Sequence, residues 1–330
     1  MLGQFGSGAP AHPNEESQPT IPKGEKAMKA AVIEDFGDAN KFQIEDVNEP
    51  AVGPGEVRVR VRATSVNPID WKIRSGSTRG RIDVALPAIL GRDLAGEVDE
   101  VGPGVTGFTK GQRVMALANG TYAELTTAKA DVLAPIPEKL SFEQAAALPL
   151  VVTTGAQLME RAIKIQRDQK VLVLGALGGV GRSAVHVALE HGATVLAGVR
   201  RSQMEEARTL GAHKVIAIDE EKELEKLRDL DAVADTIGGP TAERAVRTLK
   251  DGGVYGTVVG PPKGAAERNI QVARMMAQPD ASRLYQLAND AARGTFRIPI
   301  AKTLPLDQVR EAHEEAEHGH ARGKIILKAA

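Results

Sequence analysis

A glycine-rich turn follows a short apolar run in the segment Lys170–Gly181, which reads KVLVLGALGGVG. The run Val171–Leu174 is continuous, as in a parallel strand that is covered on both faces. Gly175, Gly178 and Gly181 permit a tight turn, a close approach of the backbone to a pyrophosphate, and close packing of the next helix, whose free N–H groups would face the phosphates. The pattern predicts a dinucleotide-binding turn. Its predicted cofactor contacts are Ala176, Gly178, Gly179, Val180 and Gly181.

Two arginines follow the next predicted strand, Thr194–Val199. An NAD site usually has an acid at this place, which accepts hydrogen bonds from the ribose hydroxyls. Here Arg200 and Arg201 stand there, and the nearest acids, Glu205 and Glu206, come a helical turn later. Guanidinium groups bind a 2′-phosphate through charge-assisted bonds, so the sequence favours NADPH over NADH. The alternative is a pair of solvated arginines that cap a strand.

Composition limits the class of protein. The chain has 330 residues, enough for two domains, and 42% of them are hydrophobic. The net charge of −1 gives no reason to expect a nucleic-acid partner or an acidic membrane surface. The absence of cysteine excludes disulfides and thiolate metal sites and suits a reducing cytosol. No apolar run approaches ~18 residues, so we expect no segment that spans a membrane. Together with the charge, this predicts a cytoplasmic protein without a membrane or nucleic-acid partner.

The order of predicted elements divides the chain into two domains. Residues 1–27 are rich in Gly, Pro, Ser, Glu and Gln and are expected to form a disordered extension. Residues 28–145 contain short strands and turns, such as the strictly alternating Glu56–Ala63, and residues 293–330 return to this pattern. In residues 146–292 strands alternate with helices, which predicts a doubly wound parallel sheet. The strands expected in that sheet are Lys170–Leu174, Thr194–Val199, Lys214–Ala217, Ala232–Asp235, Val254–Val259 and Ile270–Met275.

Five further blocks have a recognisable pattern. They are SVNPIDWKIRSG (Ser65–Gly76), LGRDLAGEVDEVGPGV (Leu90–Val105), GTYAEL (Gly120–Leu125), DTIGG (Asp235–Gly239) and GHARGKIIL (Gly319–Leu327). Together with the glycine turn they resemble the medium-chain dehydrogenase/reductase superfamily, and within it the zinc-independent quinone oxidoreductase branch related to zeta-crystallin. The resemblance covers nearly the whole chain. It implies an α/β fold with a Rossmann NADP-binding domain, residues 146–292, and a GroES-like substrate domain, residues 28–145 completed by 293–330.

The resemblance implies that no metal is bound. Zinc-dependent members carry a cysteine where this chain has Asn67 and a histidine where it has Arg92, and an amide is a poor zinc ligand while a guanidinium is none. His313, His318 and His320 lie among glutamates near the C-terminus. We interpret these histidines as part of a charged helix face, and not as a metal site.

Three polar side chains are candidates for contact with the nicotinamide or the substrate. By the resemblance, Asn67 lies where the nicotinamide end of the cofactor meets the β domain, although turn chemistry alone also explains an Asn-Pro pair. Lys72 would polarise a carbonyl oxygen as hydride arrives, and a solvated loop lysine is the alternative. Tyr122 would donate a hydrogen bond or a proton, unless it is only packed in its strand.

Three more cofactor contacts follow from the resemblance. Thr154 matches the family threonine at the start of the first Rossmann-side helix. Gly238 and Gly260 end later strands, where the carboxyl edge of the sheet faces the ligand. Family members pair their Rossmann sheets edge to edge, so we expect a homodimer through the edge strand Ile270–Met275.

The implied activity is reduction of quinones or α,β-unsaturated carbonyls by hydride transfer from NADPH, without zinc. Two alternatives stay open. One is a 2-enoyl thioester reductase that acts on acyl carriers. The other is a nucleotide-binding protein with a structural or RNA-binding role, as in zeta-crystallin relatives, although a near-neutral charge and 3% aromatic residues argue against RNA binding by stacking.

Overall fold

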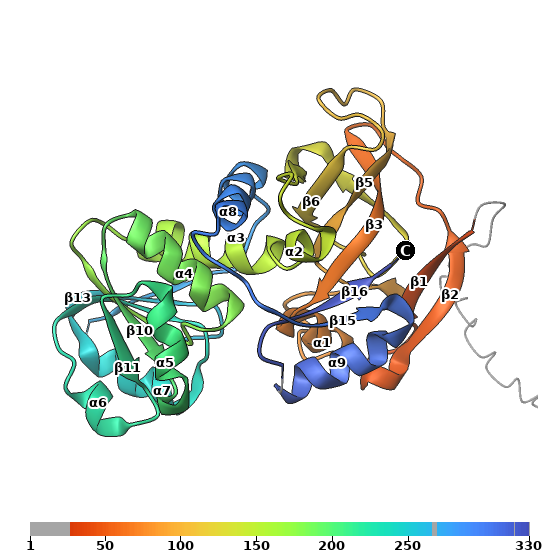
Figure 1. The fold of residues 1–330 in the computed structure, drawn as a ribbon. Coiled ribbons are helices and arrows are strands. Elements are labelled where there is room, and N and C mark those ends of the chain that lie inside the picture. The colour runs from red at the N-terminus through yellow and green to blue at the C-terminus, as the bar shows by residue number, and fades with distance from the viewer. Residues whose placement is uncertain (1–26, 266–268, 320, 330) are drawn as a thin grey trace, which may run out of the picture.

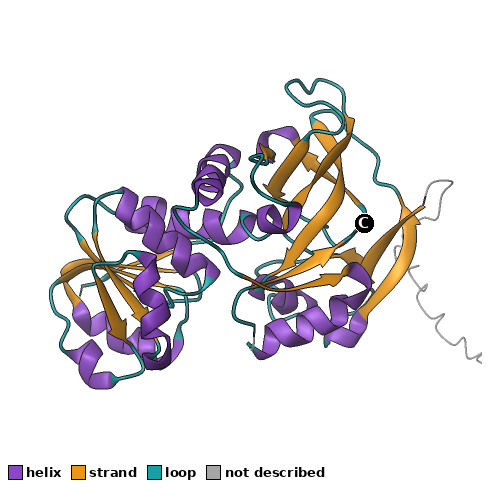
Figure 2. Ribbon diagram, in the orientation of Figure 1, coloured by secondary structure: helices purple, strands orange, loops and turns teal. Residues whose placement is uncertain are grey.

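Two lobes make up the described part of the chain, residues 27–265, 269–319 and 321–329 of a computed structural model (Figure 1). Helices and strands both contribute extensively, so the predicted α/β class is confirmed (Figure 2). The expected extension, residues 1–27, lies outside the described residues except for Ala27, which begins the first strand. His320 also lies outside them. None of the described helices is long and apolar enough to cross a membrane.

The first lobe contains a six-stranded parallel sheet with the order β11-β10-β9-β12-β13-β14. The chain therefore reverses its direction of travel beside β9, and ligands of doubly wound sheets bind at such a switch point. The first three strands have the predicted bounds, and the sixth is one residue shorter at each end than predicted. The six strands are β9 (Lys170–Leu174), β10 (Thr194–Val199), β11 (Lys214–Ala217), β12 (Leu230–Asp235), β13 (Leu249–Thr257) and β14 (Gln271–Arg274).

Strand β13 ends two residues before the predicted end at Val259. The side chain of Thr257 explains this end, because its Oγ1 accepts hydrogen bonds from the backbone N–H groups of Val259 and Gly260, both at 3.2 Å. A threonine hydroxyl that bonds its own following backbone turns the chain out of the ladder.

Alternate residues of β9 pack into two different cores, one on each face of the sheet. Val171 and Val173 belong to the core that includes α3, α4 and α8, whereas Leu172 and Leu174 belong to the core under α6 and α7. A strand buried on both faces needs a continuous apolar run, which is what the sequence has. The helices of this lobe are α3 (Pro149–Gln157), α4 (Gly179–Glu190), α5 (Met204–Ala207), α6 (Glu221–Glu225), α7 (Gly239–Ala245) and α8 (Ala281–Arg293).

The second lobe is a β structure built from both ends of the described chain. Its larger sheet has the order β15-β16-β3-β5-β6-β8, and β7 also pairs with β3. The late strand β16 (Lys324–Lys328) runs antiparallel beside the early strand β3 (Glu56–Val66), as the blue and orange ribbons show (Figure 1). A smaller sheet has the order β2-β1-β4. The remaining elements are β1 (Ala27–Ile33), β2 (Phe42–Asn48), α1 (Pro68–Arg74), β4 (Ala88–Ile89), β5 (Asp93–Val101), β6 (Arg113–Leu117), β7 (Leu125–Lys129), β8 (Ala134–Pro135), α2 (Phe142–Ala146), β15 (Ile300–Pro305) and α9 (Val309–His318).

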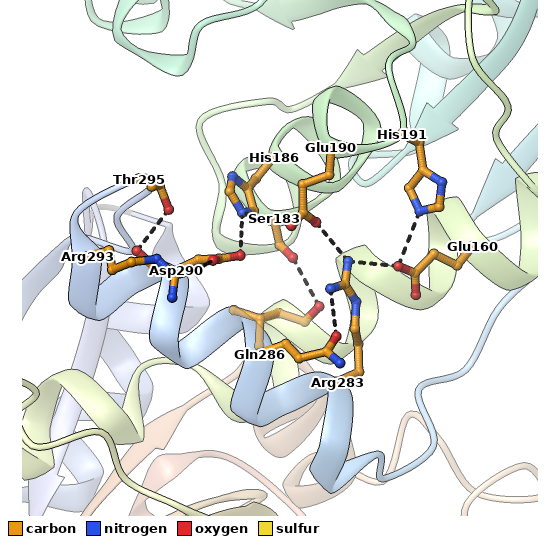
Figure 3. Close-up of polar contacts among 11 residues, drawn as sticks. Glu160, Ser183, His186, Glu190, His191, Arg283, Gln286, Asp290, Arg293 and Thr295 are labelled. Atoms are coloured by element: carbon orange, nitrogen blue, oxygen red, sulfur yellow. Dashed lines mark hydrogen bonds and ion pairs between the residues drawn. The ribbon is translucent and has the colours of Figure 1, made fainter.

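Charged side chains tie α4 to α8 and to the π-helical turn that extends α3 (Figure 3). The Arg283 guanidinium lies 2.8 Å from the carboxylates of both Glu160 and Glu190. One turn away, His186 Nε2 lies 3.0 Å from Asp290 Oδ2. These contacts fix α3, which borders the space between the lobes (Figure 1).

Candidate active site

A cleft with a volume of about 830 Å³ lies between the two lobes. Its first wall is formed by the glycine turn and by residues at the ends of β10 and β12. Its second wall is formed by the start of α1 and by the segment that leads into β16. A cleft at the switch point of a doubly wound sheet is the usual place for a nucleotide. Residues that line it include Asn67, Val151, Gly178, Gly179, Val180, Arg182, Arg200, Ile237, Arg322 and Lys324.

The glycines of the turn have different tasks. Gly175 has a φ of +75°, a conformation that favours glycine. A Cβ on Gly181 would lie 2.2 Å from the carbonyl oxygen of Gly175, so this glycine lets α4 pack against β9. A Cβ on Gly178 would meet only that same oxygen, at 3.3 Å. Gly178 therefore leaves the cleft side of the turn open, as a bound pyrophosphate requires.

The predicted contacts of the turn divide into two groups. Gly178, Gly179 and Val180 line the cleft, whereas Ala176 and Gly181 are buried and shape the turn from behind. No side chain caps the N-terminus of α4, so its first N–H groups stay available to a ligand.

The two predicted phosphate-binding arginines are separated. Arg200 lines the cleft. The Arg201 side chain is 65% exposed, and its Nη1 lies 3.0 Å from the Glu220 carboxylate. The backbone N–H of Arg201 donates to Asp219 Oδ1, at 2.8 Å. In this geometry only the first arginine of the pair borders the ligand space.

Arg182 is a cation of the cleft wall that we did not expect from the sequence. It belongs to the first turn of α4 and lines the cleft. Its Nη2 lies 2.6 Å from Glu206 Oε1, and its Nε donates to the Leu177 carbonyl at 3.0 Å. Burial lowers the pKa of Arg182, and the Glu206 carboxylate opposes that shift.

Three further predicted cofactor contacts lie near the cleft without lining it. Thr154 Oγ1 donates to the Leu150 carbonyl inside α3, at 2.6 Å. Gly238 has a φ of +70°, and its N–H donates to Asp235 Oδ1 at 2.9 Å. Gly260 is held by Thr257, as described above. Their contact with a cofactor stays a prediction.

Asn67 belongs to a buried polar network beside the cleft. Its Nδ2 donates to Asp93 Oδ2 at 2.7 Å and to the Ser65 carbonyl at 3.3 Å. Its Oδ1 accepts from Lys324 Nζ at 2.5 Å. Both amide hydrogens are therefore engaged within the protein, and the amide is held in one orientation.

Asp93 is the centre of that network. Its Oδ2 accepts from Asn67, Lys324 and the Ser65 hydroxyl, and its Oδ1 accepts from the backbone N–H of Leu150 at 2.7 Å. Leu150 lies in the first turn of α3, where an anion is favoured by the unpaired N–H groups and the helix dipole. Asp93, on β5 of the second lobe, thus caps a helix of the first lobe.

Lys72 and Tyr122 do not line the cleft among the described residues. The Lys72 ammonium lies 5.4 Å from the centre of the Trp71 ring. Tyr122 is fully buried, and its hydroxyl contacts Asp70 Oδ2 at 3.1 Å and His313 Nε2 at 3.2 Å. Burial raises the pKa of Tyr122 well above its usual range. Tyr122 is thus enclosed by protein atoms, whereas Lys72 is half-buried, and a catalytic role for either side chain stays a prediction.

The bonds around Tyr122 have a fixed direction. Arg74 Nη1 can only donate, so His313 Nδ1, at 3.3 Å, must accept. His313 Nε2 therefore carries the hydrogen and donates to Tyr122, which donates to Asp70. Burial lowers the pKa of His313 to about 3, and burial raises the pKa of Asp70 to about 7, with the nearby Asp93 adding to the rise. The expected charged face of α9 is thus wrong for His313, which points into the core.

Lys324 and Arg322 are the functional candidates that sequence reasoning missed. Both line the cleft. They come from the block Gly319–Leu327, which carried the resemblance but was interpreted only as a strand. The signal available in the sequence was the lysine itself, at the start of an otherwise apolar run.

Comparisons with known proteins agree with this architecture. Residues 53–138 match the alcohol dehydrogenase GroES-like domain, and residues 210–327 match the zinc-binding dehydrogenase domain. The quinone oxidoreductase of Mus musculus is 29% identical over 92% of this chain and 98% of its own length. A 2-haloacrylate reductase of a Burkholderia species is 30% identical over 91% of this chain and 98% of its own length. The structure of the quinone oxidoreductase from Coxiella burnetii is similar with a TM-score of 0.83, at 30% identity, over 92% of this chain and 100% of that one.

The fold and cleft define an oxidoreductase that uses a nicotinamide cofactor and acts on a small molecule. The chain belongs to the medium-chain dehydrogenase/reductase family, in its quinone oxidoreductase branch. The predicted combination of a Rossmann sheet with a GroES-like β domain is confirmed.

The residues at the expected catalytic metal position do not suit zinc, although one matching domain is described as zinc-binding. Asn67 offers an amide that is already bonded to Asp93 and Lys324. The Lys324 ammonium places a positive charge beside Asn67, where a metal ion would need ligands, and the guanidinium of Arg92 is no ligand. We therefore derive no chemistry through a metal.

Among the described residues, one group of possible ligands lies in the α4–α8 contact (Figure 3). It consists of His186, Glu190 and Asp290, whose ligand atoms lie within 4.8 Å of one another. Arg283 pairs with Glu190, and Arg293 pairs with Asp290. These guanidinium groups already neutralise the carboxylates, so the group is a structural ion-pair cluster.

Proposed function

We propose that this protein reduces quinones or α,β-unsaturated carbonyls with NADPH, without zinc. The observation that carries the proposal is the cleft itself. It joins a dinucleotide-binding turn and an arginine on one wall to a buried lysine on the other. The names of the relatives, quinone oxidoreductase and 2-haloacrylate reductase, support an electron-poor conjugated acceptor.

The chain offers suitable groups for each part of the cofactor. Gly178, Gly179 and the N-terminus of α4 would hold the pyrophosphate. Arg322, on the opposite wall, would add a positive charge near it. Arg200 would bind the 2′-phosphate, which is the reason to prefer NADPH. Once bound, the cofactor supplies the hydride.

The protein's own contribution is to orient the reactants and to stabilise charge. A conjugated acceptor becomes a delocalised anion, which hydrogen bonds can stabilise without a Lewis acid. An alkoxide from a simple alcohol is not delocalised, so it needs stronger stabilisation than hydrogen bonds supply. We therefore expect quinones and enones to be reduced, and ethanol-like alcohols not to be oxidised.

The test is NADPH oxidation with a panel of acceptors, namely a quinone, an enone and an enoyl thioester, beside ethanol oxidation with NADP⁺. Quinone or enone reduction that survives EDTA, with no ethanol oxidation, is the expected result. Robust alcohol oxidation, or activity lost together with one zinc per chain, would overturn the proposal. Reduction of the thioester alone would identify the alternative enoyl thioester reductase.

We also propose a homodimer through β14. This strand is the edge of the six-stranded sheet, and Val272 on it is exposed, as are Val259 and Met276 nearby in the chain. An exposed edge strand favours pairing with another strand. Sedimentation velocity should find a dimer, and Val272→Lys should shift it to a monomer.

A further inference from the structure

The buried polar network presents one charged group to the cleft. Asn67, Asp93 and Ser65 have no exposed surface, whereas Lys324 is 7% exposed and lines the cleft. We propose that Lys324 is the catalytic cation of this site. Its ammonium donates a hydrogen bond to the oxygen of the acceptor and stabilises the negative charge that hydride transfer creates there. This inference rests on the proposed function and names the group that performs its central step.

The position of the ammonium is fixed by its surroundings. Lys324 Nζ donates to Asn67 Oδ1 at 2.5 Å, to the Val66 carbonyl at 3.2 Å and to Asp93 Oδ2 at 3.3 Å. The residue begins β16, so a sheet and not a loop supports it. The bonds to Val66 and Asp93 are long, and an arriving oxygen that replaces the Val66 carbonyl breaks only one of them.

Asn67 orients this ammonium. Both of its Nδ2 hydrogens are engaged, by Asp93 and by the Ser65 carbonyl, so its Oδ1 must face Lys324. This makes Asn67 a positioning residue, which acts through the lysine. Asp93 supplies the negative charge that balances the buried ammonium, since it accepts four hydrogen bonds and has no exposed surface.

The chemistry balances without a further reactant. Hydride carries both electrons to the acceptor carbon, a π electron pair of the acceptor moves to its oxygen, and Lys324 donates a hydrogen bond to that oxygen. The proton that completes the reduction comes from water. A hydrogen bond to the developing anion is stronger than one to the neutral acceptor, so it lowers the barrier of the chemical step. Low exposure strengthens the effect further.

A phenol probe tests the interaction without turnover. 4-Nitrophenol resembles the reduced acceptor, and its absorbance reports how much of the bound molecule is ionised in the presence of NADP⁺. We expect the wild type to favour bound phenolate by on the order of 10- to 100-fold over Lys324→Met. Lys324→Arg, which keeps the positive charge beside Asp93, should retain part of the effect. Equal ionisation in wild type and Lys324→Met would overturn the inference.

Kinetics give a second, independent readout. In Lys324→Met the kcat for a quinone and an enone should fall on the order of 10- to 100-fold while the Kd for NADPH, measured by fluorescence, stays unchanged. The matched control is Lys328→Met on the same strand, whose exposed ammonium lies 3.4 Å from Glu143 and should leave both values unchanged. Parallel losses of kcat and NADPH affinity in Lys324→Arg and Lys324→Met would show a structural role and overturn the inference. If the wild type reduces no acceptor, the proposed function fails, and the phenol probe still decides what Lys324 does.

Discussion

The carboxylate of Asp93 accepts a hydrogen bond from the backbone N–H of Leu150 at 2.7 Å, so a strand of one lobe caps a helix of the other. The N-cap residue of α3 is Leu148, which has no side-chain oxygen to cap the helix. The same carboxylate also holds Asn67 and Lys324. One acid of the second lobe therefore contacts both a helix of the first lobe and the polar groups beside the cleft.

Replacing this acid should destabilise the whole protein. In Asp93→Asn one oxygen becomes an NH₂ group, and the buried Lys324 ammonium loses its counter-ion. Breaking a buried ion pair from one side costs about 3–5 kcal/mol, so we expect a loss of this size in the free energy of unfolding, measured with urea. The control is Glu100→Gln on the same strand, an exposed partner of Arg58, which should cost less than about 1 kcal/mol. An equal effect of both changes would contradict this account of Asp93.

The opposite pKa shifts of the buried residues Asp70 and His313 should partly cancel in the pH dependence of the free energy of unfolding. The pKa of Asp70 rises from 3.8 to about 7, so between these values the folded protein keeps a proton that the unfolded chain has lost. Stability then falls as pH rises. The pKa of His313 falls from 6.5 to about 3, so the unfolded chain holds the extra proton and stability rises with pH. The two trends oppose each other between pH 3.8 and pH 6.5.

Single variants should reveal each trend. In His313→Gln the free energy of unfolding should fall more steeply than in the wild type as pH rises from 3.8 towards 7, because the opposing effect of His313 is gone. In Asp70→Asn it should rise with pH up to 6.5, because only the His313 term remains. Urea unfolding across this range measures both slopes. Identical slopes in the two variants would contradict opposite effects of Asp70 and His313 on stability.

The two arginines after β10 should differ in their effect on NADPH binding. Arg200 lines the cleft, whereas Arg201 is paired with Glu220. Arg200→Ala should weaken NADPH binding by about 1.5–3 kcal/mol and leave NADH binding almost unchanged. Arg201→Ala is the matched control and should have a smaller effect on both. Calorimetric titration with each cofactor checks this, and a larger loss in Arg201→Ala would reverse the assignment.

Two substitutions in the glycine turn should have different effects, one on folding and the other on cofactor binding. A Cβ on Gly181 would lie 2.2 Å from the Gly175 carbonyl oxygen, so Gly181→Ala should displace α4 and lower the melting temperature. A Cβ on Gly178 has only one close neighbour, at 3.3 Å, so Gly178→Ala should fold and lose dinucleotide affinity. Thermal unfolding and NADPH fluorescence distinguish the two. A Gly178→Ala variant with unchanged affinity would argue against phosphate binding at this turn.

The strands, turns and helices that depend on local sequence could be predicted. The continuous apolar run of β9 and the glycines after it fix a strand, a turn and a helix within a few residues of one another. The strict alternation in Glu56–Ala63 likewise gives one half-buried strand, now seen as part of β3.

The polar network could not be predicted, because its members meet only in the folded chain. Asn67 and Lys324 are separated by 257 positions, and no local pattern links them. The surroundings of Tyr122 were equally hidden, since this residue lies in a bend before β7 and not in the expected strand, and its partners Asp70 and His313 are distant in sequence. His313 was misjudged because its glutamate neighbours suggest a solvated face, whereas Arg74 and Tyr122 hold it in the core.

The pairing of β16 with β3 has a consequence for synthesis. Lys324 bonds the carbonyl of Val66 across a separation of 258 positions, and nearly all of the first lobe is encoded between them. During translation that edge of β3 therefore stays unpaired until the ribosome has made β16. An unpaired strand edge can pair with another chain and lead to aggregation. The nascent chain can therefore form its nucleotide turn before the segment that leads into β16, which completes the opposite wall of its cleft, has been made.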